Sequence, residues 1–319
     1  MATVIAVAVA LVVSHAIARA AGFLGPRVGL VDLPDGELKT HARPIPPLGG
    51  LGVVAGYLAG GIAARTLGDS DWFTPSTVVA VVAAAGLGLT DDRVSLSPRI
   101  RLVAEIAIGA TLVAGPLAAG EIGPFVAALG MVAAVVLINA VNLFDGLDGL
   151  VSSAALAGLV GLGLFAGSFG GSVGALVAAG AIGGFLPLNW NPARMFLGDN
   201  GSYAIGVLLA ASMLDTGSMS GVVAAGSVAT VFLVDLAATL IRRRRSGVPL
   251  FAGDRSHTYD VLGDRGWGVK RLAGTAAVVN LVSVVVAAIV AGWSLTAAAV
   301  VAVATVLSLV VIVVITVHR

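Results

Sequence analysis

Two adjacent aspartates end an apolar segment early in the chain. In GLTDDRVSLSPRIR, residues 88–101, Asp91 and Asp92 follow a run rich in glycine and alanine, and three arginines come after them. Neighbouring carboxylates disfavour each other's charge, and the mouth of an apolar helix adds a desolvation cost. An arrangement that is costly to maintain indicates a functional site.

A second acidic cluster lies in NAVNLFDGLDGL, residues 139–150. Asn139 and Asn142 are three residues apart and share one face at the end of a predicted helix, and Asp145 and Asp148 continue this spacing. Glycines that follow each aspartate let the backbone approach a ligand closely. Oxygen ligands of this kind suit Mg²⁺, which takes one or two protein carboxylates and shares its other positions with water and phosphates. The alternative is a helix C-cap followed by Asp-Gly turns.

Two further clusters follow. FLGDNGS, residues 196–202, places Asp199 just before an apolar segment, where a metal ligand and a carboxylate favoured by the helix dipole give the same pattern. DRSHTYD, residues 254–260, lies in a basic loop. His41 and His257 are the histidines best placed for phosphate contact, but their separation does not match a zinc site. The chain has no cysteine, which excludes disulfides and thiolate metal sites, and it lacks a Walker-type phosphate loop.

The elements that carry these clusters are predicted to be membrane spans. The chain of 319 residues is 58% hydrophobic and 11% charged, whereas soluble domains are about 25% charged. We therefore expect an all-α, polytopic helical membrane protein that forms a single integral membrane domain over residues 1–319. Eleven spans are predicted, or ten if 150–190 is one span with a re-entrant piece. The spans are 3–23, 48–66, 75–90, 99–119, 123–143, 150–168, 172–190, 201–215, 219–241, 272–292 and 295–316.

The distribution of charge predicts the orientation. With the N-terminus outside, all of the 18 basic residues except Arg19 and Arg65 fall in inner loops or at the inner C-terminus. The positive-inside rule does not demand acids there, yet all four acidic clusters lie on the same face. This indicates an active site at the cytoplasmic surface of the membrane. The net charge of +1 argues against a nucleic-acid partner.

These stretches together resemble the polyprenyl-phosphate N-acetylhexosamine-1-phosphate transferases, glycosyltransferase family 4. The similarity runs in order through VDLPDGELKTHARPIPPLGG (31–50), GLTDDR (88–93), NAVNLFDGLDGL (139–150), FLGDNGS (196–202), FLVDLAATLIRRR (232–244) and DRSHTYD (254–260). The first loop is closest to the bacterial undecaprenyl-phosphate GlcNAc-1-phosphate transferases.

The resemblance implies a reaction. A polyprenyl phosphate, such as undecaprenyl phosphate, would attack the β-phosphorus of a UDP-N-acetylhexosamine, giving a lipid-linked diphosphate sugar and UMP and initiating cell-envelope glycan synthesis. By the same resemblance, Asn142 and Asp199 would hold Mg²⁺ or Mn²⁺, and Asp91 and Asp92 would be catalytic residues near the acceptor phosphate.

Other positions would bind the substrates. The resemblance assigns this role to Arg101, Asn139, Asp145, Asp148, Arg255, His257, Lys39 and His41. Arg101 would contact the diphosphate, Arg255 and His257 phosphate or sugar, and Asp148 with Asp145 the uracil side. Asp235, buried in a span, is expected to support another residue rather than to bind a ligand.

The pattern departs from the family in two loops. Tyr259 and Asp260 stand where further histidines are common, and Glu37-Leu38 stand where an Arg-Lys pair is common. The donor therefore stays open between UDP-GlcNAc, UDP-MurNAc-pentapeptide and a modified UDP-N-acetylsugar. From another class, a secondary transporter is the alternative, but it would carry charged or broken-helix features near the midplane. We expect the bacterial cytoplasmic membrane as the location, with the oligomeric state open between monomer and homodimer.

Overall fold

The computed structural model describes residues 1–33, 43–68, 72–165, 173–216, 219–247, 257–290, 300, 303, 305–307 and 309. Within these ranges the regular structure is helical, and one isolated antiparallel bridge joins Asp32 to Ile45. The all-α prediction is therefore confirmed.

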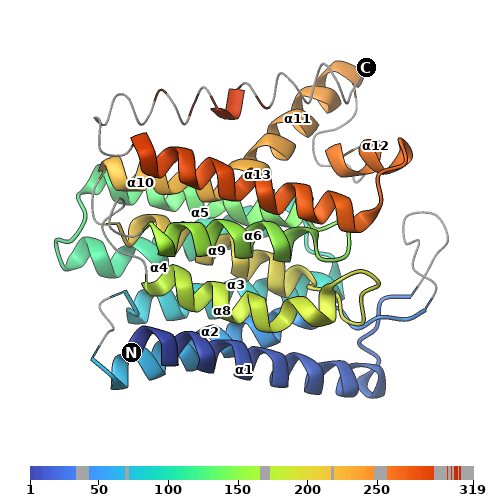
Figure 1. Ribbon diagram of the computed structural model, residues 1–319, viewed down its shortest axis with the longest axis horizontal. Coiled ribbons are helices and arrows are strands. Elements are labelled where there is room, and N and C mark those ends of the chain that lie inside the picture. The colour runs from blue at the N-terminus through green and yellow to red at the C-terminus, as the bar shows by residue number, and fades with distance from the viewer. Residues whose placement is uncertain are drawn as a thin grey trace.

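The helices form an up-and-down bundle in which successive long helices run in alternating directions (Figure 1). In chain order they are α1 (Ala2–Leu24), η1 (Gly25–Val28), α2 (Gly49–Thr66), α3 (Pro75–Val94), α4 (Pro98–Ala118), α5 (Pro124–Phe144), α6 (Leu150–Leu164), α8 (Val173–Asn189), α9 (Asp199–Leu214), α10 (Met219–Ala225), η2 (Gly226–Ala229), α11 (Thr230–Ser246), α12 (Thr258–Asp264) and α13 (Val269–Val290).

Most predicted spans coincide with these helices. The segment 150–190 contains two separate helices, α6 and α8, as the eleven-span interpretation requires. The predicted span 219–241 is divided into α10, η2 and α11, and the last predicted span, 295–316, falls mostly outside the described residues.

The division at η2 is stabilised from another helix. The side chain of Asn280 in α13 donates to the backbone oxygens of Val228 (2.7 Å) and Ala154 (3.0 Å) and accepts from the backbone nitrogen of Val231 (3.4 Å). Because backbone groups inside a bilayer must be satisfied within the protein, one buried amide here permits the irregular turn.

Small residues allow the first helices to pack closely. Gly52, Gly56 and Gly60 of α2 lie against α1, and a Cβ added at Gly56 would stand 2.5 Å from the backbone oxygen of Ala10. Spacing of small residues by four positions is the usual means of close helix contact in membranes, where apolar burial gives no advantage over lipid.

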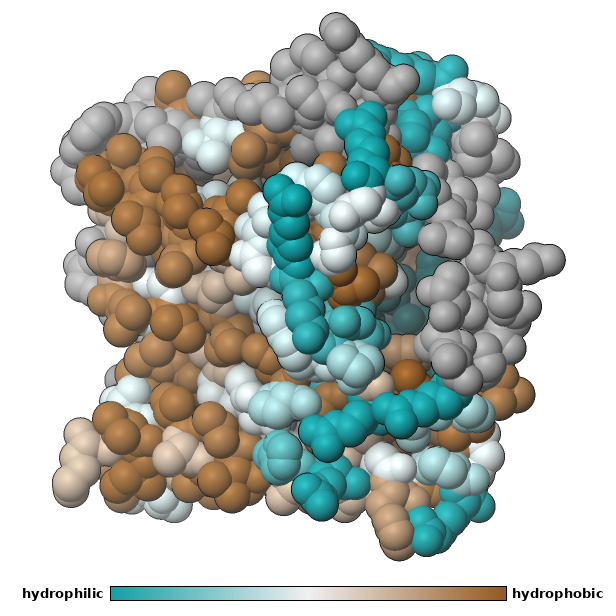
Figure 2. Space-filling view, turned by 45° about the vertical axis from the view of Figure 1, so that its right-hand side comes forward, coloured by the Kyte–Doolittle hydropathy of each residue, from teal (hydrophilic) through white to brown (hydrophobic). Residues whose placement is uncertain are grey.

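Five helical segments in the described residues are long and apolar enough to cross a membrane: Ala2–Arg27, Pro98–Ala118, Pro124–Phe144, Gly221–Ser246 and Val269–Val290. Figure 2 shows hydrophobic side chains covering one side of the molecule and hydrophilic ones gathered toward the other end. The protein is thus a multi-pass membrane protein. We call the polar end, where α3 and α5 finish and α9 begins, the site end.

Backbone pairing fixes the loops at the site end. The backbone nitrogens of Gly49 and Gly50, at the start of α2, donate to the backbone oxygens of Phe196 (2.9 Å) and Leu197 (3.0 Å). The loop before α9 is thereby held against the start of α2, which brings FLGDNGS to the centre of this end.

Candidate active site

Asp92, near the end of α3, caps the N-terminus of α9. One carboxylate oxygen accepts from the backbone nitrogen of Asp199 (3.2 Å), and the other accepts from the Asn200 side chain (3.2 Å). The N-cap position of α9 is Gly198, which has no side chain to cap the helix itself. A carboxylate supplied from another helix satisfies these free N–H groups and is favoured by the helix dipole. The motifs GLTDDR (88–93) and FLGDNGS (196–202) therefore meet at the start of α9.

Asp91 lies on a different face of α3 and is buried. Its carboxylate accepts hydrogen bonds from the Tyr203 hydroxyl (2.6 Å), the Leu96 backbone nitrogen (2.7 Å) and Arg101 Nη1 (3.1 Å). Successive residues on a helix point in directions about 100° apart, so neighbours in sequence need not share a task. Asp91 joins α3 to α4 and α9, whereas Asp92 is exposed at the surface of the site.

Asn142 connects α5 to the same point. Its side-chain nitrogen donates to Asp199 Oδ1 (2.7 Å) and to the Ser202 hydroxyl (3.2 Å). The predicted pair of metal ligands, Asn142 and Asp199, is therefore in direct contact, although the two residues are far apart in sequence.

Several carboxylates share this region. Burial, with the charge of Asp92 next in size, raises the pKa of Asp199 to about 7. Burial, followed by Asp199, Asp92 and Asp148, raises the pKa of Asp145 well above its usual range. Partial desolvation raises the pKa of Asp92, and the neighbouring Asp91 adds to this. A site that disfavours its own negative charges in this way will gain free energy from a bound cation.

The donor set fits a hard divalent cation. In the described residues, no group of three or more His, Cys, Asp or Glu side chains forms a ready metal cluster. Mg²⁺ does not require one, because it is commonly held by one or two carboxylates together with substrate phosphates. Asp199 supplies a carboxylate, and rotation of the Asn142 amide about its last bond would present its oxygen beside it.

Arg101, in the first turn of α4, is bound to Asp91 and has one guanidinium nitrogen without a partner in the described residues. That nitrogen, Nε, is buried, whereas the guanidinium as a whole is partly exposed and suits an oxygen of a bound phosphate. Glu105, one helical turn further along α4, is buried and influences Arg101 electrostatically.

Asn139 forms a hydrogen bond with Glu105. Its side-chain nitrogen donates to Glu105 Oε2 (2.6 Å) and to the backbone oxygen of Val135 (2.9 Å). It thus joins α5 to α4, and in the described part of the chain its hydrogen bonds go to these groups and not to the Asn142–Asp199 pair. Its predicted contact with substrate stays a prediction.

The three-residue spacing beyond Asn142 does not continue as a helix face. The helix α5 ends at Phe144, and Asp145 is its C-cap. Asp148 accepts from the Asn191 side chain and from the Ala193 backbone nitrogen, each at 2.9 Å. The backbone at Asp145 is therefore the helix C-cap that the alternative interpretation predicted. The negative charge of Asp199 nevertheless contributes to the raised pKa of Asp145.

His257 stands at the start of α12 and is held by α11. Its Nδ1 lies 2.9 Å from Asp235 Oδ2 and 3.2 Å from the Thr239 hydroxyl. Its ring stacks on Tyr259 at 5.2 Å with planes 4° apart, and the Tyr259 hydroxyl donates to the backbone oxygen of Leu143. Asp235 thus supports the histidine and directs its Nδ1, which leaves Nε2 as the nitrogen for a ligand.

The departure from the expected histidines has a structural role. Asp260 accepts from the backbone nitrogen of His257 (3.1 Å) and completes a capping box for α12. Tyr259 and Asp260 therefore fix the position of His257. Lys39, His41 and Arg255 lie outside the described residues.

Sequence reasoning did not identify three residues of this network: Asn200, Tyr203 and Glu105. Tyr203 follows Asp199 by four positions and Glu105 follows Arg101 by four, so each shares a helix face with a predicted site residue. A buried acid in an apolar span, as at Glu105, was a further signal. Asn200 is fully buried and donates to Asp92 and to the backbone oxygen of Pro47 (2.7 Å).

Comparison with known proteins gives concordant matches. Residues 74–217 match the family described as Glycosyl transferase family 4. The chain is 31% identical over 256 residues to a probable undecaprenyl-phosphate N-acetylglucosaminyl 1-phosphate transferase of Bacillus subtilis, covering 73% of this chain and 69% of that protein. It is 30% identical over 294 residues to a decaprenyl-phosphate N-acetylglucosaminephosphotransferase of Mycobacterium tuberculosis (78% and 72% covered). It is also 30% identical over 263 residues to an undecaprenyl-phosphate alpha-N-acetylglucosaminyl 1-phosphate transferase of Escherichia coli (74% and 70% covered).

Proposed function

The chain belongs to glycosyl transferase family 4, and from this membership we propose that it transfers N-acetylglucosamine 1-phosphate from UDP-GlcNAc to a polyprenyl phosphate. The three relatives compared are named as transferases of this sugar phosphate to undecaprenyl or decaprenyl phosphate. The enzyme class is a membrane phosphoglycosyltransferase.

The reaction is a phosphoryl substitution. An oxygen of the polyprenyl phosphate attacks the β-phosphorus of the donor, and the bond from that phosphorus to the oxygen bridging it to the α-phosphorus breaks. The products are a polyprenyl-diphosphate sugar and UMP. Such reactions depend mainly on alignment of the two phosphates and on neutralisation of their charge.

One observation carries the proposal. Asn142 donates to Asp199 at 2.7 Å, and Asp92 accepts from the backbone of Asp199 at 3.2 Å, so three helices place their polar ends around one carboxylate. The surplus of negative charge there, with Arg101 beside it, suits a ligand that combines a cation with phosphate.

We assign Asp199 and Asn142 to a divalent cation, Mg²⁺ or Mn²⁺. When bound, that ion would neutralise charge on the donor diphosphate. The protein's own contribution is to hold the carboxylate and the amide in contact, and to keep Asp92 fixed against the start of α9.

The roles of the remaining site residues are assigned from the exposure of their side chains and from their hydrogen-bond partners. Asp92 is the candidate proton acceptor on the side of the lipid phosphate, because Asp91 is buried and accepts three hydrogen bonds. Asp91 acts by holding Arg101, whose partly exposed guanidinium is assigned to a phosphate oxygen. His257, oriented by Asp235, is assigned to a phosphate or sugar oxygen. Asp145 and Asp148 are assigned to the nucleoside side.

The same proposal includes the location. We place the site end at the cytoplasmic surface of a bacterial inner membrane, since the basic residues favour that side. The lipid acceptor would then reach the site from the surrounding bilayer and the nucleotide donor from water.

The test uses purified full-length protein with undecaprenyl phosphate, MgCl₂ and a panel of UDP-N-acetylsugars. We expect UMP and a lipid-linked diphosphate sugar in equal amounts, with UDP-GlcNAc the best donor. Preference for a muramoyl or modified donor would replace the donor assignment. Release of UMP without lipid product, or no turnover with any donor, would refute the transferase proposal.

A further inference from the structure

Asn200, the second residue of α9, is fully buried although it lies at the polar site end of the protein. A buried amide group costs free energy unless it finds hydrogen-bond partners, so asparagine rarely occupies such a position for packing alone. The partners of Asn200 therefore indicate its task.

The amide nitrogen of Asn200 joins two distant parts of the chain. Nδ2 donates to the backbone oxygen of Pro47 (2.7 Å) and to Asp92 Oδ2 (3.2 Å). Because both partners are acceptors, the orientation of the amide is fixed, and its oxygen cannot take the place of the nitrogen. That oxygen, Oδ1, is buried and has no hydrogen-bond partner in the described part of the chain. An unsatisfied buried oxygen lowers stability, so stability alone does not account for an asparagine at this position.

Two glycines provide the room for these contacts. A Cβ added at Gly50 would collide with Asn200 Oδ1, and one added at Gly88 would collide with the backbone oxygen of Asp199. Gly88 lies four residues before Asp92 in α3, so the two share one face of that helix. The same face of α3 thus carries both the close approach to α9 and the carboxylate that Asn200 binds.

Asp92 is held through both of its carboxylate oxygens. Oδ1 accepts from the backbone nitrogen of Asp199, and Oδ2 accepts from the Asn200 side chain. One hydrogen bond would leave this exposed carboxylate able to turn about the contact, whereas two hydrogen bonds to different oxygens fix its plane. Each oxygen keeps a second lone pair, so Asp92 can still accept from a substrate. Geometry is the first requirement for a group that takes a proton.

We propose that Asn200 is a positioning residue for the transfer reaction, which fixes the Asp92 carboxylate in the orientation that faces the acceptor phosphate. The inference rests on the role proposed for Asp92 and adds a residue that does not itself touch a substrate. Because Nδ2 also binds the backbone oxygen of Pro47, the segment just before α2 takes part in orienting Asp92. Locking the side chain of an acting residue by hydrogen bonds from its neighbours is the general means of holding such a site in its productive geometry.

Asn200→Leu is the principal test, because leucine keeps the branched shape of the side chain and lacks its N–H donors. The assay uses purified full-length protein, undecaprenyl phosphate, UDP-GlcNAc and MgCl₂. We expect kcat to fall by about 10–100-fold, the scale for loss of a residue that orients another. The KM for the donor and the half-saturating concentration of MgCl₂ should stay at their wild-type values. A shift in the MgCl₂ requirement would show that Asp199 itself is displaced, and it would overturn the proposal.

A double-mutant cycle with Asp92→Asn separates positioning from general damage. If Asn200 acts through Asp92, Asn200→Leu should have little further effect on the residual rate once the carboxylate is absent. The same fold-loss in both backgrounds would overturn the proposal, because the loss would then arise through Pro47 or through α9 itself. Asn200→Asp, which keeps the size but replaces the donors by an acceptor, should show the same non-additivity and serves if the leucine variant does not fold.

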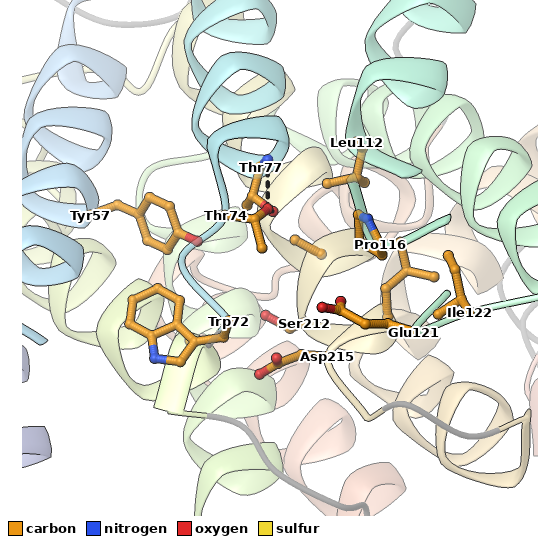
Figure 3. A pocket seen from close by; sticks show the side chains of 13 residues that line it. Tyr57, Trp72, Thr74, Thr77, Leu112, Pro116, Glu121, Ile122, Ser212 and Asp215 are labelled. Atoms are coloured by element: carbon orange, nitrogen blue, oxygen red, sulfur yellow. Dashed lines mark hydrogen bonds between the residues drawn. The ribbon is translucent and has the colours of Figure 1, made fainter. Parts of the chain in front are cut away.

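Ser212, on the same helix, gives the matched control. It is 4% exposed, its hydroxyl donates to the backbone oxygen of Leu208 (2.8 Å), and it lines a cavity of about 260 Å³ at the other end of α9 (Figure 3). The 12 positions from 200 to 212 span roughly 18 Å at about 1.5 Å per residue. Ser212→Ala therefore removes a buried polar group from α9 without a contact to Asp92, and it should keep the wild-type kcat. A fall equal to that of Asn200→Leu would show that kcat responds to any such change in α9 and would overturn the proposal.

Crystal structures of the wild-type protein and of Asn200→Leu give a readout that needs no turnover. We expect both Asp92 oxygens to be bound at the start of α9 in the wild type, and the carboxylate to turn away from Asp199 in the variant. An unchanged Asp92 would overturn the positioning role even if activity falls. Absence of transfer by the wild-type protein with every donor would refute the proposed function instead, and the two structures would still decide whether Asn200 holds Asp92.

Discussion

The carboxylate of Asp92 accepts a hydrogen bond from the backbone nitrogen of Asp199 at 3.2 Å and so joins the end of α3 to the start of α9. Asn142 binds the side chain of the same Asp199 from α5. Asp199 is therefore the point where three polar helix ends meet, and changes at these residues should have distinguishable effects.

Asp199→Asn removes the carboxylate assigned to the divalent cation but keeps the size of the side chain. We expect turnover to fall by about 100-fold or more, the scale for loss of one essential electrostatic contact. Steady-state release of UMP is the measurement. A thermal midpoint no lower than that of wild type would show that the fold persists. The control is Asp264→Asn, which removes an exposed carboxylate on α12, and activity of Asp199→Asn close to that of this control would remove Asp199 from the metal site.

Substitution of Asp91 should mainly lower stability, whereas substitution of Asp92 should mainly lower the catalytic rate. Asp92→Asn is expected to lower kcat with little change in the KM for the donor, because Asp92 is assigned to the acceptor side. Asp91→Asn should lower stability by about 1–3 kcal/mol, because the buried carboxylate binds Arg101 and Tyr203. Tyr203→Phe, which removes one of those donors, is the matched comparison. A donor-affinity defect in Asp92→Asn, or an unchanged thermal midpoint in Asp91→Asn, would contradict this division.

Stability of the metal-free protein should decrease as pH rises. The pKa of Asp199 is raised to about 7, above the value near 4 expected in an unfolded chain, so the folded state binds more protons between these values. Stability is thus greatest below pH 4 for this group and is lost as pH rises to about 7. Asp145, whose pKa is also raised, acts in the same direction.

Thermal midpoints measured in EDTA from pH 5 to 8 check this linkage. MgCl₂ should stabilise the protein more at pH 8 than at pH 5, because the cation competes with protons for the carboxylate. In Asp199→Asn the fall with pH should be smaller. A metal effect that is the same at both pH values would argue against a cation at Asp199.

Asp235→Asn should reduce the rate through His257. The carboxylate holds Nδ1 at 2.9 Å and accepts from the Thr258 backbone nitrogen at 2.9 Å. Loss of a residue that orients another commonly costs about 10–100-fold in activity. Thr239→Val, which removes the longer contact to the same nitrogen, should cost less. If the threonine variant is the more impaired, Asp235 does not orient the histidine.

The orientation can be read by labelling, because the chain has no cysteine of its own. Asp264→Cys at the site end and Leu67→Cys after α2 are exposed positions. In intact cells a membrane-impermeant maleimide should modify only the cysteine at position 67, and in inverted vesicles only that at position 264. The reverse pattern would place the active site outside the cytoplasm.

The sequence predicted the long apolar helices well because their pattern is local. Composition indicated a membrane protein, and the spans at 75–90 and 123–143 lie within or nearly coincide with α3 and α5. The break at η2 was missed, since it depends on Asn280, which reaches the turn from a helix about fifty residues away.

By itself, the sequence determined the all-α membrane class, the polar residues at one end and the motifs that identify the family. Only the tertiary structure decided how those motifs combine. In the folded protein Asp91 and Asp92 have different partners, Asn139 donates to Glu105, and Asn142 donates to Asp199. The physical reason is that residue type and spacing fix which face of one helix is polar, whereas partners depend on how different helices are rotated and packed against each other.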